Sequence, residues 1–296
     1  MASRKIFKKL KYALRVLPDK AYIQLYYFAR FHRLCNLKEP KTFNEKLQWL
    51  KLYDRRPEYT GMVDKYEVKK YVADKIGSEY IIPTLGVWDR FDDIDFDALP
   101  ERFVLKCTHD SEGLVIVKDK KTLDRAAAKE KLESAMKQNF YYIGREWVYK
   151  NVKPRIIAEE YVEDHATGEL RDYKFFCFDG TPKAMFTASG RSAGTTKFDF
   201  FDLDYKNLGI KQHYPNSEVL PQKPQNFEKM KELAAELSRK IPHVRVDFYE
   251  ADGKLLFGEL TFSHFGGFMP FDTPEWDRTF GEWLRLPDKK RNGKEN

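Results

Sequence analysis

The chain has 296 residues, of which 42% are hydrophobic and 15% aromatic, and this composition excludes an intrinsically disordered polypeptide. The formal net charge is +7, but seven basic residues fall within the first twenty, so the remainder is nearly neutral and lacks the charge of a dedicated nucleic-acid groove. The three cysteines, Cys35, Cys107 and Cys177, are scattered, which excludes a disulfide framework and a zinc motif and favours a reducing compartment.

The first twenty residues are predicted to form a helix with one apolar and one basic face. Two interpretations stay open: a solvated helix, or a basic amphipathic helix that rests on anionic lipid or on an acidic polymer. This stretch lacks the apolar core and cleavage site of a secretory signal, and no stretch reaches the ~20 apolar residues of a membrane span. We therefore expect a cytoplasmic protein, with contact to the inner face of the membrane as an open alternative.

Helices dominate the next part of the chain. Thr42 and Glu45 form a capping box that predicts a helix with Phe43, Leu47 and Leu50 on one face. A second helix is expected to begin at Asp64 and to stop at Gly77. Residues 81–88 then read as a short strand interrupted by a proline.

From Phe103 onward, strands and hairpins alternate with helices. Asp179-Gly180 and Asp252-Gly253 are strong hairpin signals, and Asn226 is expected to cap a helix. The predicted strands are 103–107, 114–117, 155–162, 173–178, 181–188, 244–250 and 255–262, and the predicted helices are 122–140 and the one after residue 226. Helices interleaved with hairpins indicate an α+β fold, not a doubly wound parallel sheet.

The last hairpin carries two carboxylates that suggest a metal site. Asp247 and Glu259 would repel each other on one face unless a cation lies between them, and hard oxygen ligands beside Arg245 suit a magnesium-bound triphosphate. They share a face only if the connecting loop has an odd number of residues. We expect the three-residue loop 251–253, with Phe257, Glu259 and Thr261 on one side of the return strand. A two-residue turn would separate the carboxylates.

Two further segments carry polar groups at the ends of apolar strands. Lys106 ends an apolar strand directly before the polar turn 108–113, where it must reach solvent or meet an anion. That turn has one glycine, Gly113, so it is no Walker loop, although its backbone N–H groups are able to cover phosphates. Glu159 and Glu160 end the strand that begins at Ile156, which taken alone is only a strand with an acidic end.

Taken in order, these segments resemble the ATP-grasp superfamily, and within it the teichuronopeptide-biosynthesis (TupA-like) amidoligase branch, which is found with surface-polysaccharide genes. The resemblance extends from about Thr42 to Phe271. It is carried by KTFNEKL at 41–47, DKY at 64–66, YIIPTLG at 80–86, FVLK at 103–106, DYKF at 172–175, RVDF at 245–248 and GELTFS at 258–263.

The resemblance implies two α+β lobes that clasp ATP and magnesium, preceded by an N-terminal helical segment. The implied regions are a basic helical segment at 1–60, a small region at 61–100, the first lobe at 101–160, the second lobe with the metal site at 161–285 and a disordered tail at 286–296. The implied catalytic residues are Lys106, Lys174 and Arg245. The implied nucleotide contacts are Lys106, Ser111, Gly113, Glu159, Glu160, Tyr161, Val162, Asp172 and Lys174.

The implied metal ligands are Asp247, Glu259 and Thr261. Many superfamily members have asparagine at the position of Thr261, and a hydroxyl is a poorer ligand than an amide oxygen, so one or two metals remain open. Candidate substrate contacts are Arg191, Ser192, Lys197, Ser263, His264, Gly266 and Gly267, with His264 as a candidate base for an incoming amine.

The expected chemistry is activation of a carboxylate as an acyl phosphate, followed by attack of an amine, with the turn 108–113 as a candidate lid. The family association suggests a uronic acid or amino-acid carboxylate in surface or capsular polysaccharide synthesis, and contacts with other enzymes of that synthesis. Three alternatives stay open: a metal-dependent glycosyltransferase that uses Asp202 and Asp204, an ATP-grasp sugar kinase, and a non-catalytic module that binds polysaccharide or membrane. Nothing in the sequence identifies the two substrates or the oligomeric state.

Overall fold

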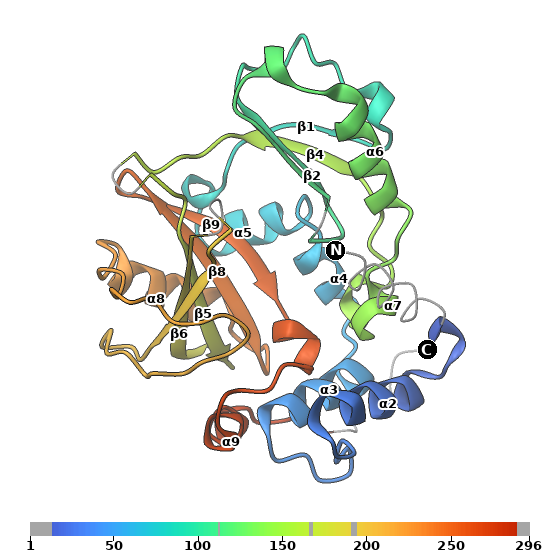
Figure 1. Cartoon of the computed structure of the whole chain (residues 1–296), viewed down its shortest axis with the longest axis vertical. Helices are drawn as coiled ribbons and strands as arrows, with labels where there is room; N and C mark the ends of the chain where they lie inside the picture. The colour runs from blue at the N-terminus through green and yellow to red at the C-terminus, as the bar shows by residue number, and fades with distance from the viewer. Residues whose placement is uncertain (1–13, 112, 166–167, 191–193, 289–296) are drawn as a thin grey trace.

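Two antiparallel sheets form the frame of the computed structural model, which describes residues 14–111, 113–165, 168–190 and 194–288 (Figure 1). The first sheet has the order β1-β4-β2-β3. Its strands are β1 (Thr84–Trp88), β4 (Ile156–Glu160), β2 (Phe103–Cys107) and β3 (Leu114–Val117). Helix α6 (Arg125–Met136) packs on this sheet and buries Ala128 and Leu132 against it.

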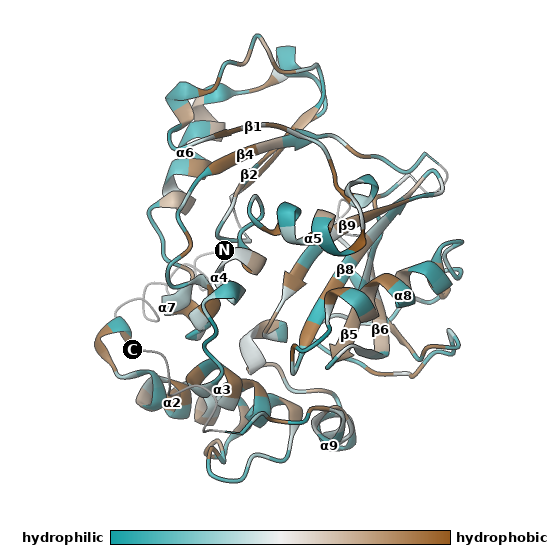
Figure 2. Ribbon diagram, turned by 180° about the vertical axis from the view of Figure 1, so that it is seen from behind, coloured by the Kyte–Doolittle hydropathy of each residue, from teal (hydrophilic) through white to brown (hydrophobic). Residues whose placement is uncertain are grey.

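The second sheet is larger and has the order β7-β6-β5-β8-β9. Its strands are β7 (Lys197–Phe201), β6 (Thr181–Ser189), β5 (Asp172–Phe178), β8 (Val244–Ala251) and β9 (Lys254–Thr261). Helix α8 (Phe227–Leu237) turns one apolar stripe onto the sheet, while much of its outer surface is hydrophilic (Figure 2). The central strand β5 is buried along its whole length, as the middle of a covered sheet should be.

Helices and short turns fill the space beside and between the sheets. The α-helices are α2 (Asp19–Phe31), α3 (Phe43–Tyr53), α4 (Glu58–Val63), α5 (Val68–Ile76), α7 (Tyr141–Gly144) and α9 (Pro274–Trp283). The 3-10 turns are η1 (Leu14–Val16), η2 (Ser78–Tyr80), η3 (Phe91–Asp93), η4 (Lys120–Thr122), η5 (Trp147–Tyr149) and η6 (His264–Gly267). None of the helices described here is long and apolar enough to cross a membrane.

Several sequence predictions are confirmed. The α+β class is correct, and the Thr42 capping box is present, with the Thr42 hydroxyl accepting from the Glu45 N–H and the Glu45 carboxylate accepting from the Thr42 N–H. The hairpin at Asp179-Gly180 is also correct, because both residues adopt positive φ angles of 46° and 80° in a two-residue turn.

Other predicted elements have different limits. Asp64 does not begin a helix; its carboxylate accepts from the N–H groups of Tyr66 and Glu67 in a turn, and α5 begins four residues later, at Val68. The predicted helix 122–140 is shorter, because Asp124 caps it and the regular part ends at Met136. Asn226 stands before α8, but its side chain donates to Glu250 and to the Gly253 carbonyl instead of capping the helix.

The first sheet also takes in a strand from outside the predicted first lobe. Strand β1 belongs to the region 61–100, which was expected to precede that lobe, yet it pairs with β4 along Thr84–Trp88. At the other end of the chain, Leu286 packs against the core cluster beneath α3 and α9. The rest of the predicted tail, from 289, and residues 1–13 of the basic segment lie outside the described residues.

Candidate functional site

The two carboxylates of the last hairpin face each other, but not through the predicted three-residue loop. Ala251 pairs with Lys254, so the turn is the two-residue Asp252-Gly253. A β-bulge at Gly258 restores the alignment, since Phe248 pairs with Phe257 while Asp247 pairs with Glu259. The expected loop is therefore wrong, and the expected pairing is present.

The bulge also separates residues that strict alternation would put on one face. Phe257 pairs with Phe248 and shares its buried core cluster, whereas Glu259 pairs with Asp247 and opens into the cleft, which Phe257 also borders. A Cβ on Gly258 would lie 3.1 Å from the Asp247 carbonyl oxygen, so the bulge leaves little room for a side chain. Glycine at this position thus permits the geometry that places Glu259 in the site.

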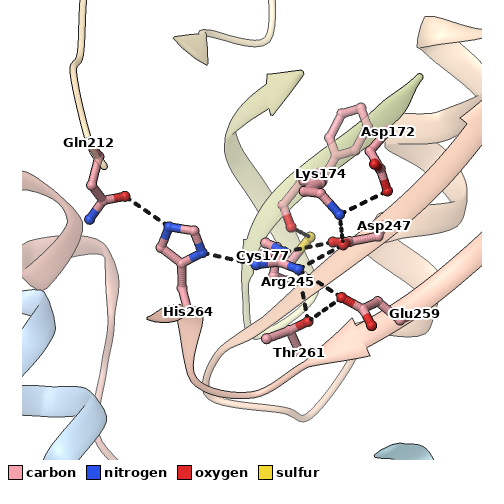
Figure 3. A network of polar contacts seen from close by, with 10 residues as sticks. Asp172, Lys174, Cys177, Gln212, Arg245, Asp247, Glu259, Thr261 and His264 are labelled. Carbon is pink, nitrogen blue, oxygen red and sulfur yellow. Dashed lines mark hydrogen bonds and ion pairs between the residues drawn. The ribbon is translucent and has the colours of Figure 1, made fainter. Parts of the chain in front are cut away.

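Arg245 and Lys174 converge on Asp247 (Figure 3). Arg245 donates to both Asp247 carboxylate oxygens at 2.7 Å, and Lys174, on the neighbouring strand β5, donates to Asp247 and, at 3.0 Å, to Asp172. Arg245 also donates to Glu259 Oε1 at 3.0 Å. Three adjacent strands therefore supply one row of alternating charges.

These neighbouring charges shift the pKa values of Glu259 and Arg245. Burial would raise the pKa of Glu259, but Lys174, Arg245 and Lys65 outweigh it and hold that pKa at about 2. The Glu259 side chain is nonetheless 43% exposed, because it opens into the cleft. Burial lowers and the Asp247 carboxylate raises the pKa of Arg245, and the net shift is upward. Glu259 is thus an ionised oxygen ligand that a cation in the cleft can reach.

His264 does not have the geometry of a free base. Arginine only donates, so His264 Nδ1, 2.9 Å from Arg245, is an acceptor, and Nε2 carries the proton that it shares with Gln212 Oε1 at 2.8 Å. Burial lowers the pKa of His264 further, so the ring is neutral. Its role here is to position Arg245, and the base interpretation is not supported.

Thr261 bridges the same groups. Its hydroxyl accepts from Arg245 at 3.0 Å and donates to Glu259 Oε1 at 3.3 Å. The hydroxyl is therefore engaged by two side chains. Asp247 is likewise engaged, by Arg245 and Lys174, and is fully buried, so Glu259 is the carboxylate of the row that opens into the cleft.

A second charge cluster lies on the first sheet. Lys106 donates to Glu159 Oε2 at 2.6 Å, and Lys69 forms an ion pair with Glu159 Oε1 at the same distance. Burial raises the pKa of Glu159, but the two lysines lower it overall. Lys69 was not predicted as a site residue from the sequence, because a lysine in the first turn of a helix usually faces solvent. Its position shortly after Asp64-Lys65 was the available sequence signal.

The first residues of the predicted lid turn are buried. Thr108, His109 and Asp110 are buried, and the Asp110 carboxylate accepts from the Gly113 N–H at 3.0 Å. Lys65, also missed in the sequence, donates to the Asp110 carbonyl and so ties the turn to the segment before α5. Ser111 and Gly113 both line the cleft beside Lys106.

The cleft between the sheets consists of three cavities that share lining residues. The middle one, of about 180 Å³, is lined by Lys106 and Glu159 of one charge cluster and by Lys174 and Glu259 of the other. A cavity of about 450 Å³ extends along the end of β4, between Glu160–Glu163 and apolar side chains that include Val104 and Ile116. Another, of about 760 Å³, lies on the far side of Arg245.

The candidate substrate residues fall into two groups. Ser263, His264 and Gly266 line the largest cavity, whereas the Gly267 carbonyl is turned to Gln48 of α3. Lys197 is not among the described residues that line the three cavities. Arg191 and Ser192 lie outside the described residues.

The glycosyltransferase motif is a turn. Asp202 accepts from the backbone N–H groups of Asp204 and Lys206, and Asp204 is 79% exposed. Neither aspartate lines a cavity of the cleft. Such an Asx turn needs no metal, because the carboxylate is satisfied by its own backbone.

Comparison with known proteins decides the family. The model of the family described as "TupA-like ATPgrasp" matches residues 45–285. The chain belongs to the TupA-like ATP-grasp family. The resemblance inferred from the sequence is thereby confirmed. None of the curated proteins matches the sequence.

Several solved structures are similar to this ATP-grasp chain. A D-alanine–D-alanine ligase from Bacillus anthracis is 17% identical, with a TM-score of 0.40 over 68% of this chain and 57% of that one. The ATP-grasp ligase PsnB, in a complex with a precursor variant, Mg and ADP, is 11% identical, with a TM-score of 0.43 over 76% and 60%. The D-cycloserine synthetase DcsG is 16% identical, with a TM-score of 0.40 over 78% and 70%. The match spans under two thirds of the first two chains, and the family assignment rests on residues 45–285.

The ATP-grasp residues fit a magnesium nucleotide. Lys69 and Lys106 pair with Glu159, and a phosphate chain could replace that carboxylate as their anionic partner. The apolar part of the cavity beside Glu160 suits a flat nucleotide base. No cluster of three or more His, Cys, Asp or Glu side chains able to hold a metal occurs in the part of the chain described here. Glu259 would be the carboxylate that meets Mg²⁺ in the cleft, since its side chain is 43% exposed, whereas Asp247 is buried and both its oxygens accept from Arg245.

Proposed function

We propose that this ATP-grasp enzyme is a carboxylate–amine ligase that joins its substrates through an acyl phosphate. The observation that carries the proposal is the continuity of the cleft: an apolar slot, a lysine pair, Lys174 with Glu259, and a large cavity follow one another. A nucleotide in the slot would direct its phosphates toward Arg245. The largest cavity is then the place for both remaining substrates.

The residues of the cleft suit two successive transfers. Lys69 and Lys106 bind phosphate oxygens, and Arg245 and Lys174 balance the charge that develops on the γ-phosphoryl group; bound Mg²⁺ would supply further charge neutralisation there. A substrate carboxylate oxygen attacks the γ-phosphorus, the bond from that phosphorus to the bridging oxygen breaks, and ADP leaves. An amine nitrogen then attacks the carboxyl carbon, the carbon–oxygen bond to phosphate breaks, and inorganic phosphate leaves.

We base the proposed substrate class on the family branch. Its association with surface polysaccharide supports a uronic acid or an amino-acid carboxylate as the first substrate. The basic N-terminal sequence, together with the exposed Leu25 and Phe28 of α2, supports peripheral contact with a membrane where such polymers are assembled.

An assay of ADP release tests the ligase. Purified protein is incubated with Mg-ATP and panels of uronic-acid glycosides and amino acids, and we expect ADP only when a carboxylate and an amine are both present. ADP release with a hydroxyl acceptor and no amine would indicate the sugar kinase instead. Absence of ADP with every pair, together with no shift of the melting temperature by Mg-ATP, would overturn the proposal.

A further inference from the structure

The largest cavity contains a buried carboxylate that the proposed phosphoryl transfer does not use. Glu146 follows α7 and is 7% exposed, and it lines the cavity of about 760 Å³ together with Arg245 and Glu259. In the described part of the chain, no hydrogen-bond donor reaches its carboxylate. Lys51 and Arg245 are the cations whose charge acts on it, and its carboxylate is open to a hydrogen-bond donor that enters the cavity.

The backbone around Glu146 is held in place by a buried lysine. Lys51 donates to the carbonyl oxygens of Gly144 and Gly266, both at 2.7 Å, and so joins the two segments that flank the Glu146 side chain. A Cβ on Gly266 would lie 3.4 Å from Glu146 Oε1, which shows how closely that segment approaches the carboxylate. Lys51 thus fixes the surroundings of the carboxylate while its hydrogen bonds go to the backbone.

The energetics favour a cationic partner. Burial raises the pKa of Glu146 to about 7, although Lys51 and Arg245 act in the opposite direction. A group that brings N–H donors and a positive charge would restore the hydrogen bonds and stabilise the ionised form. The aromatic rings around the cavity can contact the apolar part of such a ligand, and their faces can attract an ammonium group. These rings are Tyr26, Phe140, Tyr149, Phe186, Phe198, Phe265 and Phe268.

We propose that Glu146 binds the amino group of the second substrate, so that this cavity is the subsite for a primary amine. The inference rests on the proposed ligase function and names the residue that recognises the nucleophile. It places the amine on the side of Arg245 that lies away from the adenine slot, within the same cavity as Glu259.

Glu146 also has a defined part in the second transfer. An alkylammonium ion gives one proton to the Glu146 carboxylate, and its nitrogen lone pair attacks the carboxyl carbon of the acyl phosphate. The carbon–nitrogen bond forms, the carbon–oxygen bond to phosphate breaks, and a second proton leaves with the phosphate. One hydrogen stays on the amide nitrogen, and Glu146 returns its proton to water.

The test measures ligand binding to the full chain in the presence of Mg-ADP. A panel of primary amines and amino acids, each paired with its N-acetyl derivative, is screened by saturation-transfer NMR, and affinities follow from calorimetry. We expect at least one amine to bind the wild type in preference to its N-acetyl form. Glu146→Gln should weaken that binding roughly tenfold or more, because a charge-assisted hydrogen bond is lost.

Matched variants separate this role from a structural one. Glu130→Gln, on the exposed surface of α6, should bind amines like the wild type, and Glu146→Asp should recover part of the lost affinity. Mg-ADP affinity should be equal in all four proteins. Equal amine binding by Glu146→Gln, equal binding of N-acetyl forms, or no amine bound by the wild type would overturn the inference. Failure of the wild type to bind Mg-ADP would count against the ligase site itself.

Discussion

At the scale of single residues, Lys69 and Lys106 are the cations at the predicted phosphate site. Both contact the Glu159 carboxylate, and Lys69 also donates to the Ile82 carbonyl at 2.6 Å and to the Thr84 hydroxyl at 2.8 Å, so a phosphate chain would compete with these acceptors. The next residue along α5, Lys70, has an 80% exposed side chain and pairs with Asp74 one turn away. Two adjacent lysines of one helix thus have different expected roles.

We predict that Lys69→Met raises the KM for ATP by about tenfold or more, because one charge-assisted contact to phosphate is lost. Lys70→Met serves as the control and should leave the KM unchanged, since an exposed i,i+4 pair contributes little. The measurement is ADP release, or calorimetric binding of Mg-ATP where substrates are not yet known. Equal effects of the two substitutions would show that Lys69 does not contact the nucleotide.

Glu146 makes stability depend on pH in a specific direction. Its pKa is raised to about 7 in the folded protein, against a model-peptide value near 4.5, so the folded state holds the proton more tightly. Its contribution is therefore fully favourable below about pH 4.5 and declines as the pH rises toward 7. In urea unfolding series across this range, the stability of the wild type should fall relative to that of Glu146→Gln. A constant difference between the two proteins would contradict the prediction.

At the scale of elements, the bulge in β9 determines the site. It makes a two-residue turn compatible with carboxylates that face each other. We predict that Gly258→Val destabilises the protein by about 1–3 kcal/mol, because the added side chain would press on the Asp247 carbonyl. It should also weaken Mg-ATP binding, as Glu259 is displaced. Both are measured by thermal unfolding with and without Mg-ATP.

A second glycine provides the control for this substitution. Gly61→Ala lies in α4, where the nearest atom to an added Cβ is 3.9 Å away, so it should be neutral or stabilising. It should also leave the response to Mg-ATP intact. A Gly258→Val protein that responds to Mg-ATP like the wild type would show that the bulge is not needed for the site.

Elements with local signals were predictable, and those set by long-range packing were not. The Thr42 box and the Asp179-Gly180 turn act within a few residues, so the sequence alone indicated them, whereas the length of the loop at Asp252-Gly253 was predicted wrongly. The bulge was missed because strict alternation and a bulged strand differ by one residue, and the burial of Phe257 beside Phe248 in the core cluster selects between them. Lys69 was missed for a similar reason: the first sheet brings it to Glu159, 90 residues later in the chain.

At the scale of the whole molecule, the basic residues of the first twenty positions are followed in sequence by exposed apolar side chains of α2. Leu25 and Phe28 are each 51% exposed and stand three residues apart on α2, so they share one face. The preceding sequence holds most of the excess basic charge. An apolar face beside basic residues is the arrangement of a peripheral anchor, which combines burial in the interface with attraction to anionic lipid.

We predict that the full chain cosediments with vesicles that contain phosphatidylglycerol and much less with neutral vesicles. Salt at about 1 M should weaken binding, because it shortens the Debye length to about 3 Å. Leu25→Ser with Phe28→Ser should reduce binding several-fold, since apolar burial scales with area. Val219→Ser with Leu220→Ser is the matched control, because these residues are also exposed, at 86% and 46%, but lie in the loop before α8. Equal losses in the two double variants, or equal binding to neutral vesicles, would exclude α2 as the anchor.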